Sequence, residues 1–363
     1  MVDVGGGGGL SPGLVLHLLR QTPAPLTEYR GTGYSDGVAG VGTIGDVDSA
    51  ILVERIRDAA RAIDPVFLNS PQFVCEPISE KLGVTALLKV ETVNPIRSFK
   101  GRGADYLIHR LAGRADALVC ASAGNFGQGM AYSARRHGIR MTVFAATSAN
   151  PMKLDRMRAL GAEVLLVGND FDGAKAAAER YAVTSGALYI EDGLLGPIGE
   201  GAGTIGLELT AQEKNLDAIL VPLGNGSLVN GIGTWLRQAS PATRVIAVAA
   251  SGAPAMEISW RGGRPVSTES TDTIADGIAV RVPVPDALEI MRVTVDEVML
   301  VTDAEILAAM RMLLFDTGLL IEPAGAAGLA ALVKRRQELR GMRVAIPLCG
   351  GNVTHEQFRG WFS

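Results

Sequence analysis

The chain has 363 residues, with 34 basic and 38 acidic side chains and a formal net charge of −4 at pH 7, which argues against the strongly basic surface of a nucleic-acid-binding protein. Hydrophobic residues make up 47%, but no apolar run reaches the roughly 20 residues that span a bilayer, and no signal peptide is expected. The three cysteines and four histidines show neither a disulfide framework nor metal-ligand spacing, which favours a cytoplasmic protein with reduced thiols.

Residues 1–63 are predicted to form an N-terminal extension. Clusters of glycine and proline dominate this segment, and only 47–63 has the spacing of a short amphipathic helix. The run of five glycines at 5–9 has no strand before it and no clear helix after it. We therefore interpret it as a flexible tail and not as a phosphate-binding loop.

From residue 84 onward, short β-branched runs alternate with helical patterns, which is typical of βαβ units and an α/β fold with parallel sheets. The predicted strands are 86–90, 117–121, 141–145, 163–167, 187–190, 218–222, 244–248 and 343–348. The predicted helices are 103–113, 127–137, 151–160, 171–184, 201–213, 228–238, 303–317 and 324–339. Ligands of such sheets bind at the carboxyl ends of strands, so the loops that follow the strands are the places to look for a site.

A lysine in the segment N-P-I-R-S-F-K-G-R-G, residues 94–103, has two interpretations. Lys100, between Phe99 and Gly101 and just before a predicted helix, could be an ordinary surface cation. Alternatively, it is an amine that forms a Schiff base with a carbonyl compound.

Two glycine loops lead from a predicted strand into a predicted helix. Ser122-Ala123-Gly124-Asn125-Phe126 follows the strand at 117–121, and its free N–H groups would bind a carboxylate or a phosphate unless the segment is a simple helix cap. The second loop, at 223–231, has the geometry of a phosphate cradle but lacks the G-K-[ST] of a Walker A loop. Cys349 follows the strand at 343–348 and is either a small buried hydrophobe or a contact for a flat ligand.

Together, the segments S-F-K-G-R-G, A-S-A-G-N-F-G-Q-G, G-N-G-S-L-V-N-G and C-G-G-N-V, in this order, resemble those of the fold type II pyridoxal-phosphate enzymes of the tryptophan synthase beta superfamily. Within that superfamily the chain is most similar to the threonine/serine dehydratases. G-A-G-T-I-G-L-E-L, T-I-A-D-G-I-A-V and I-E-P-A-G-A-A-G also match, and the resemblance extends from about residue 66 to 353.

The resemblance implies two α/β domains with parallel-type sheets. Residues 64–100 and 198–363 would form a large domain that binds pyridoxal 5′-phosphate, and residues 101–197 would form a small domain. The cofactor would lie in the cleft between them.

The resemblance also implies roles for individual residues. Lys100 would be the catalytic residue and would hold the cofactor covalently. The other cofactor-binding residues would be Phe99 on the pyridine ring, Asn125 at the 3′-oxygen, Cys349 at the pyridine nitrogen, and Gly224, Asn225, Gly226, Ser227 and Leu228 around the phosphate. The substrate would be bound by Ser122, Ala123, Gly124, Asn125 and Phe126.

The chain departs from the family pattern at several positions. The phosphate loop reads G-N-G-S where relatives have four glycines, and Phe126 stands where many dehydratases have histidine. The usual T-P-L entry segment reads Ser70-Pro71-Gln72. The segment after the strand at 244–248 lacks the acidic ligands of metal-dependent relatives, so no metal site is expected.

The function that the resemblance implies is the α,β-elimination of a β-hydroxy amino acid, such as serine or threonine, to a 2-oxo acid and ammonia, with Lys100 as general base. The expected partner is this small amino-acid substrate, with no nucleic acid and no membrane, in a cytoplasmic homodimer. A β-replacement enzyme similar to cysteine synthase and an amino-acid racemase are the alternatives, and a ligand sensor without activity is the least favoured. Ala123 argues against the racemase, because related racemases carry a serine hydroxyl at this position and a methyl group cannot transfer a proton.

Overall fold

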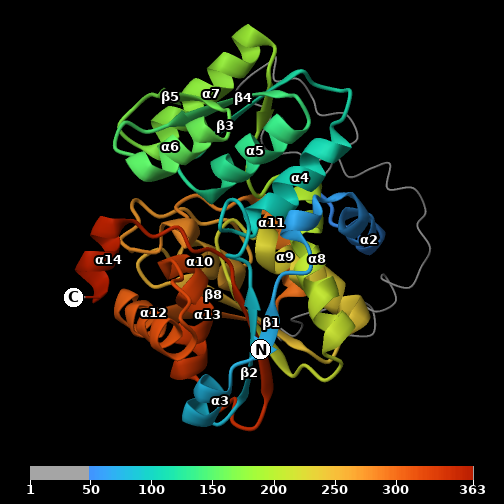
Figure 1. The fold of residues 1–363 in the computed structure, drawn as a ribbon, viewed down its shortest axis with the longest axis vertical. Helices are drawn as coiled ribbons and strands as arrows, with labels where there is room; N and C mark the ends of the chain where they lie inside the picture. The colour runs from blue at the N-terminus through green and yellow to red at the C-terminus, as the bar shows by residue number, and fades with distance from the viewer. Residues whose placement is uncertain (1–48, 363) are drawn as a thin grey trace, which may run out of the picture. The chain divides into compact units, whose positions relative to one another are not determined.

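The computed structural model describes residues 49–362, which form an α/β fold with two separate β-sheets (Figure 1). The helices are α2 Val53–Ala62, α3 Glu76–Leu82, α4 Lys100–Arg110, α5 Asn125–Arg136, α6 Pro151–Ala159, α7 Phe171–Ser185, α8 Gly196–Gln212, α9 Ser227–Ala239, α10 Ala255–Gly262, α11 Pro285–Thr294, α12 Asp303–Thr317, α13 Pro323–Lys334 and α14 His355–Phe362, with the 3-10 turns η1 Pro65–Phe67 and η2 Asp276–Ile278. The α/β fold class predicted from the sequence is confirmed.

The six-stranded sheet has the strand order β1-β2-β10-β7-β8-β9. Its strands are β1 Gln72–Val74, β2 Thr85–Val90, β7 Ala218–Pro222, β8 Arg244–Ala250, β9 Glu297–Val301 and β10 Arg343–Leu348. Only β1 is antiparallel to its neighbour, while the other pairs are parallel. The carboxyl ends of β2, β10, β7 and β8 therefore meet at one edge of the sheet.

The four-stranded sheet has the order β5-β4-β3-β6 and is parallel throughout. Its strands are β3 Ala117–Ala121, β4 Arg140–Ala145, β5 Glu163–Leu166 and β6 Leu188–Ile190. All four come from the part of the chain that the sequence assigns to a small domain. The domain boundaries themselves stay a prediction.

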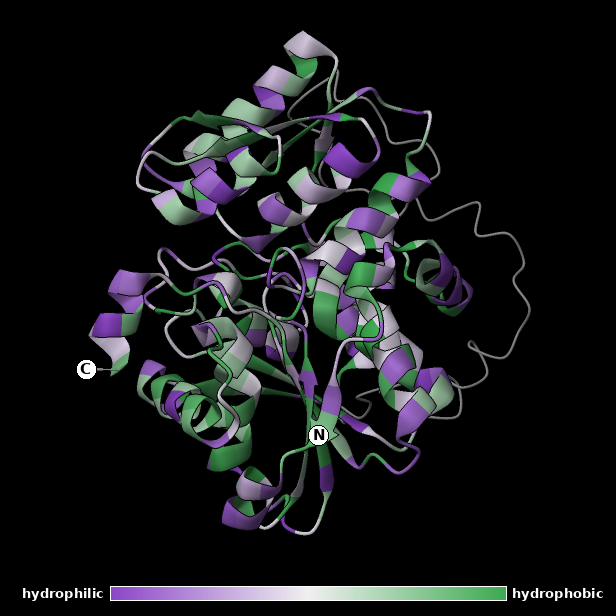
Figure 2. Ribbon diagram, viewed as in Figure 1, coloured by the Kyte–Doolittle hydropathy of each residue, from purple (hydrophilic) through white to green (hydrophobic). Residues whose placement is uncertain are grey.

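Alternating residues of each strand enter different hydrophobic cores. In β2, Ala86 and Leu88 face the core that includes residues of α12 and α13, whereas Leu87 faces the core formed with α8 and α9. In β3, Leu118 packs with residues of α4 and α5, and Val119 packs with the alanines of α7. Figure 2 shows the hydrophobic residues gathered on the sides of helices such as α12 and α13. Both sheets are therefore covered by helices on both faces, as parallel sheets require.

All eight predicted strands are present, and the sequence analysis missed β1 and β9 together with α3, α10, α11 and α14. β1 has three residues and directly follows Pro71, so it is too short for a periodic signal. α10 and α11 are short helices that begin next to a proline, at Pro254 and Pro285.

Two predicted helix starts are wrong, because glycines inside helices resemble loops. α4 begins at Lys100 and not at residue 103, and α8 begins at Gly196 and not at residue 201. α8 and α9 approach each other closely, and a methyl group on Gly231 of α9 would overlap the carbonyl oxygen of Gly199 of α8. These glycines therefore serve helix packing and not turns.

The helix predicted within 47–63 is confirmed by α2, whereas the glycine run at 5–9 and most of the predicted N-terminal extension lie outside the described residues. Between residues 49 and 362, no helix combines the length and apolarity needed to cross a bilayer.

A buried network of four charged side chains connects α4 to β2 and α8. The guanidinium group of Arg102 donates to both carboxylate oxygens of Glu91, at 2.8 and 2.9 Å, and to both of Glu208, at 2.6 and 2.9 Å. Lys89 donates to Glu208 at 2.6 Å and to the carbonyl oxygen of Ser70 at 2.8 Å. Two positive and two negative charges thus balance in the interior.

We expect Arg102→Ala to lower the free energy of unfolding by about 3–5 kcal/mol, because it leaves Glu91 and Glu208 buried without their main counter-charge. Chemical denaturation followed by circular dichroism measures this change. Arg158→Ala is the control, since its ion pair with Asp155 is exposed and should contribute less than about 1 kcal/mol. Equal effects of the two substitutions on the free energy of unfolding would contradict the role of Arg102 as the main counter-charge of Glu91 and Glu208.

Candidate active site

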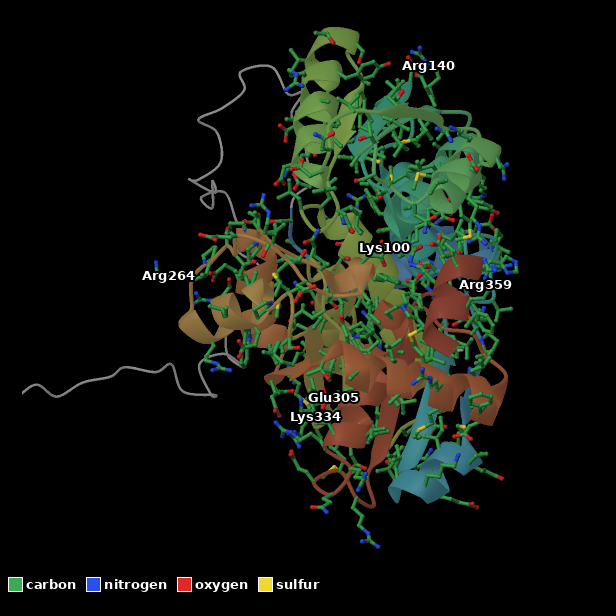
Figure 3. The ribbon with its side chains drawn as sticks, turned by 90° about the vertical axis from the view of Figure 1, so that its left-hand side faces the viewer. Lys100, Arg140, Arg264, Glu305, Lys334 and Arg359 are labelled. Atoms are coloured by element: carbon green, nitrogen blue, oxygen red, sulfur yellow. The ribbon has the colours of Figure 1, made fainter. Side chains whose placement is uncertain are left out.

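Lys100 lies where loops from both sheets meet. It is the first residue of α4, and its side chain is only 15% exposed. The Nζ atom lies 2.6 Å from Asp192 Oδ2 and 3.3 Å from Ser227 Oγ, and the rings of Phe99 and Phe126 have their centres 4.9 and 5.8 Å from it. Figure 3 shows Lys100 between the elements of the four-stranded sheet and those of the six-stranded sheet. Lys100 is therefore not an ordinary surface cation, which was one of the two interpretations that the sequence allowed.

The end of β10 fixes the backbone on which Lys100 stands. The N–H of Phe99 donates to the carbonyl oxygen of Cys349 at 3.0 Å, and the hydroxyl of Ser98 donates to the same oxygen at 3.2 Å. Ser98 also pairs with Gly350 in an isolated antiparallel bridge. Burial raises the pKa of the Cys349 thiol, so a neutral thiol lies beside the lysine segment.

The loop of residues 224–228 leads from β7 into α9 and presents unused donors. No hydrogen bond joins its backbone N–H groups to another described residue. Helix N-termini with free N–H groups bind anions, and phosphate groups in particular. Because Ser227 Oγ is 3.3 Å from Lys100 Nζ, this anion-binding site adjoins the amine.

In the loop between β3 and α5, some backbone N–H groups form hydrogen bonds within the loop itself. Ser122 Oγ accepts hydrogen bonds from the N–H groups of Gly124, at 3.2 Å, and Gly127, at 3.0 Å. The N–H groups of Asn125 and Phe126 and the hydroxyl proton of Ser122 have no acceptor among the described residues. The loop can still bind a carboxylate, but with fewer amides than the sequence suggested.

The side chain of Asn125 is held by Glu322, at the start of α13, and by Asn352, in the loop after β10. Its Nδ2 donates to Glu322 Oε1 at 2.6 Å, and Asn352 Nδ2 donates to its Oδ1 at 2.8 Å. The N–H of Asn352 donates to Glu322 Oε2 at 3.0 Å. Burial raises the pKa of Glu322 to about 7. Asn125 therefore has a fixed orientation at the start of α5, and its predicted contact with the cofactor stays a prediction.

Two contacts of α6 join the same loops. Lys153 forms an ion pair with Asp276 of η2, and Arg156 donates to the side-chain oxygen of Asn352. Together with the bond from Asn125 to Glu322, these contacts connect helices that cover the four-stranded sheet to loops at the edge of the six-stranded sheet.

Sequence reasoning missed two acidic residues of this site. Asp192 follows β6 at the carboxyl edge of its sheet, so the strand-end rule that led to the other loops would have identified it. Glu322 precedes Pro323 inside an otherwise apolar segment, which is the signal of a buried carboxylate that needs partners.

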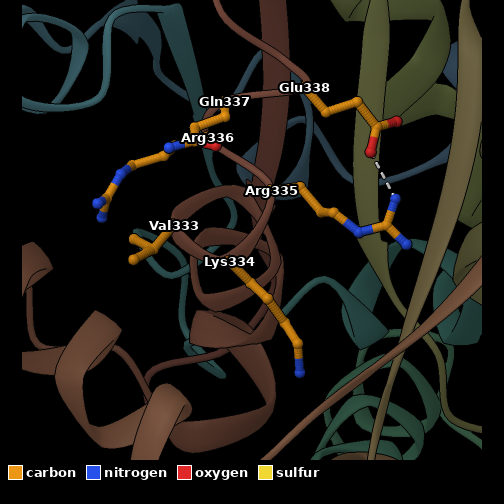
Figure 4. A pocket seen from close by; sticks show the side chains of 6 residues that line it. All are labelled: Val333, Lys334, Arg335, Arg336, Gln337 and Glu338. Carbon is orange, nitrogen blue, oxygen red and sulfur yellow. Dashed lines mark hydrogen bonds and ion pairs between the residues drawn. The ribbon is translucent and has the colours of Figure 1, made fainter.

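One surface hollow of the described chain lies at the end of α13, away from Lys100. A cavity of about 460 Å³ at the end of α13 is lined by Val333, Lys334, Arg335, Arg336, Gln337 and Glu338 (Figure 4). It contains none of the residues around Lys100. In the described part of the chain, no group of three or more His, Cys, Asp or Glu side chains is placed to bind a metal ion.

The residues around Lys100 fit an aldehyde that carries a phosphate group. The amine can react with a carbonyl carbon, and the unused N–H groups of 224–228 can bind the phosphate beside it. The ring of Phe99 and the neutral thiol of Cys349 add an apolar surface for a flat ring. These are the requirements of pyridoxal 5′-phosphate.

Comparison with known proteins decides the family. A family model described as "Pyridoxal-phosphate dependent enzyme" matches residues 63–350. The chain belongs to the pyridoxal-phosphate-dependent enzymes. The predicted family and the predicted cofactor are thus confirmed.

Relatives of this pyridoxal-phosphate-dependent enzyme include lyases and racemases. The chain is 41% identical to an L-threonine ammonia-lyase from Geobacter sulfurreducens over 83% of this chain and 73% of the relative. Threonine deaminase isoform 2 from Solanum lycopersicum has a TM-score of 0.79 at 28% identity and covers 90% of this chain and 92% of its own. Maize serine racemase has a TM-score of 0.81 at 26% identity and covers 86% of this chain and 97% of its own. The predicted similarity to threonine and serine dehydratases is confirmed.

We expect Glu322→Gln to remove a pH dependence of stability. The pKa of Glu322 is raised in the folded state, so its contribution to stability is complete below about pH 4.5 and is lost as the pH rises through about 7. The free energy of unfolding of the parent protein should therefore fall, relative to that of the variant, by about 1–3 kcal/mol between pH 5 and pH 8. Denaturant titrations at both pH values test this, and a difference that does not change with pH would refute it.

Proposed function

We propose that this enzyme catalyses the α,β-elimination of a β-hydroxy amino acid, with L-threonine and L-serine as default substrates, to a 2-oxo acid and ammonia. The observation that carries the proposal is the position of Lys100 Nζ, 3.3 Å from Ser227 Oγ at the N-terminus of α9, with the neutral thiol of Cys349 nearby. The threonine ammonia-lyase and threonine deaminase relatives support it.

The proposed cofactor-binding residues are those expected from the sequence. Lys100 would hold pyridoxal 5′-phosphate covalently, residues 224–228 would bind its phosphate, and Phe99 would pack on its ring. Asn125 and Cys349 would contact the 3′-oxygen and the pyridine nitrogen.

The chemistry divides between the cofactor and the chain. Pyridoxal phosphate, when bound, withdraws electron density from the Cα atom of an amino acid. Lys100 Nζ takes the proton from Cα as general base and passes it to the β-hydroxyl group, which leaves as water. The hydroxyl of Ser122 and the free N–H groups of Asn125 and Phe126 orient the substrate carboxylate. Cys349, as a neutral group, would not keep the pyridine nitrogen of the bound cofactor protonated, which would favour prompt loss of the β-substituent.

The fold does not by itself separate elimination from racemisation, because both kinds of enzyme share it. Ala123 favours elimination, since its methyl group cannot return a proton to the face of Cα opposite Lys100. A β-replacement enzyme similar to cysteine synthase would need access for a second substrate. A ligand sensor would not need the reactive lysine.

We also propose a cytoplasmic homodimer. All three cysteines, Cys75, Cys120 and Cys349, are buried and unpaired, as expected in a reducing compartment. Phe73 and Val74 on the edge strand β1 are about 40% exposed and are candidates for a subunit contact.

We expect borohydride to fix the cofactor on Lys100, because this amine adjoins the phosphate-binding loop. Peptide mass mapping of the reduced protein identifies the modified residue. Modification of a different lysine would refute the site.

We expect Lys100→Ala to lower the rate of elimination by at least about a thousandfold, because it removes both the anchor of the cofactor and the general base. Lys175→Ala is the control. Lys175 forms an ion pair with Glu191, and this variant should retain activity.

We expect Ala123→Ser to raise racemisation relative to elimination by about tenfold or more, because it places a hydroxyl where a second proton donor is required. Chiral chromatography of the amino acid and an assay of the 2-oxo acid give the two rates. Ala123→Val, which adds bulk without a hydroxyl, is the control. An equal increase in both variants, or in neither, would contradict the role of residue 123.

A further inference from the structure

We propose that Asp192 is a specificity-determining residue that selects amino acids with a neutral hydrogen-bond donor on the β-carbon and excludes those with an acidic side chain. This inference rests on the proposed function, since it concerns the amino acid that reacts beside Lys100.

Asp192 places a carboxylate directly at the reactive amine. Its Oδ2 accepts a hydrogen bond from Lys100 Nζ at 2.6 Å, and its side chain is 20% exposed. Its Oδ1 is buried and has no hydrogen-bond partner among the described residues. A buried carboxylate oxygen without a donor is costly. Asp192 thus presents one open acceptor beside Lys100.

The backbone of Asp192 is fixed from the phosphate-binding loop. Asn225 Nδ2 donates to the carbonyl oxygen of Asp192 at 3.3 Å. Gly193 has a φ of +89°, and a Cβ atom there would lie 2.7 Å from Cβ of Asn225. Asn225, which stands where relatives have a glycine, therefore acts as a positioning residue that ties the loop after β6 to the loop after β7.

Among the described residues around the Asp192 carboxylate, one side chain is a cation that pairs with it. Lys100 is its only ion-pair partner among the described residues, and the uncharged rings of Phe99 and Phe126 have their centres 4.9 and 5.8 Å from the amine. Cys120 also lies nearby, and burial together with the charge of Asp192 raises the pKa of its thiol. No other described cation neutralises Asp192.

Asp192 needs a further donor when Lys100 acts on a substrate. As general base, Lys100 has to be a neutral amine, so it no longer supplies an ammonium group to the carboxylate, and Oδ1 still has no donor among the described residues. A hydroxyl or amide group on the β-carbon of the substrate can supply one. A second carboxylate cannot, and the repulsion is strong because the site is partly shielded from water.

L-asparagine and L-aspartate test this inference, because they have the same size and differ in side-chain charge, and neither carries a hydroxyl leaving group. The cofactor-loaded protein is titrated with each amino acid, and the change in cofactor absorbance gives the dissociation constants. We expect the parent protein to bind L-asparagine at least about tenfold more tightly than L-aspartate. Asp192→Asn and Asp192→Ser should reduce this preference to less than about threefold.

The matched control is Glu191→Gln. Glu191 is the neighbouring carboxylate in the same loop and pairs with Lys175, so this variant should keep the preference of the parent protein. A parent protein without preference, or a preference retained in both Asp192 variants, would overturn the inference. If no protein acquires cofactor absorbance, the proposed function fails, whereas absorbance without selectivity contradicts the role of Asp192 alone.

Discussion

The arrangement of the site depends on the buried ion network around Arg102. Arg102 stands two residues after Lys100 on α4 and binds Glu91 and Glu208 with four charge-assisted hydrogen bonds. Buried ion pairs add little net stability, because desolvation offsets the attraction. Their geometry is nevertheless strict, since any displacement would leave a charge unpaired. Together with the bond from the Phe99 N–H to Cys349, the network holds the first turn of α4, and therefore Lys100, in one position.

Around this fixed lysine, polar side chains and a thiol lie at the carboxyl ends of four strands. The loops after β3, β6, β7 and β10 contribute Asn125, Asp192, Ser227 and Cys349. Each provides a different kind of group: an amide, a carboxylate, a hydroxyl next to free N–H groups, and a neutral thiol. Because the four strands belong to two sheets, contacts such as that between Asn125 and Glu322 are needed to bring the loops together.

Much of this could be predicted from the sequence, and the failures have physical reasons. Lys100, the loop at 224–228 and Cys349 lie in segments whose order resembles that of the fold type II enzymes, and this order assigned their roles where each segment alone left two interpretations open. The start of α8 was misplaced because its glycines serve helix packing, a role that depends on the partner helix and not on local sequence. Asp192 follows a strand and Glu322 lies in the matching segment I-E-P-A-G-A-A-G, but neither position specifies a role by itself. Their importance follows from three-dimensional neighbours, Lys100 and Asn125, that are distant in the sequence.

The central claim is that the groups around Lys100 eliminate the β-hydroxyl group of an amino acid. The most direct measurement is the mass balance of the cofactor-loaded protein with L-threonine, in which consumed amino acid, released ammonia and 2-oxo acid are quantified in the same reaction. The proposed function predicts that the three amounts are equal and that little D-amino acid or allo-amino acid forms. Consumption of L-threonine without ammonia, or conversion mainly to a stereoisomer, would contradict it.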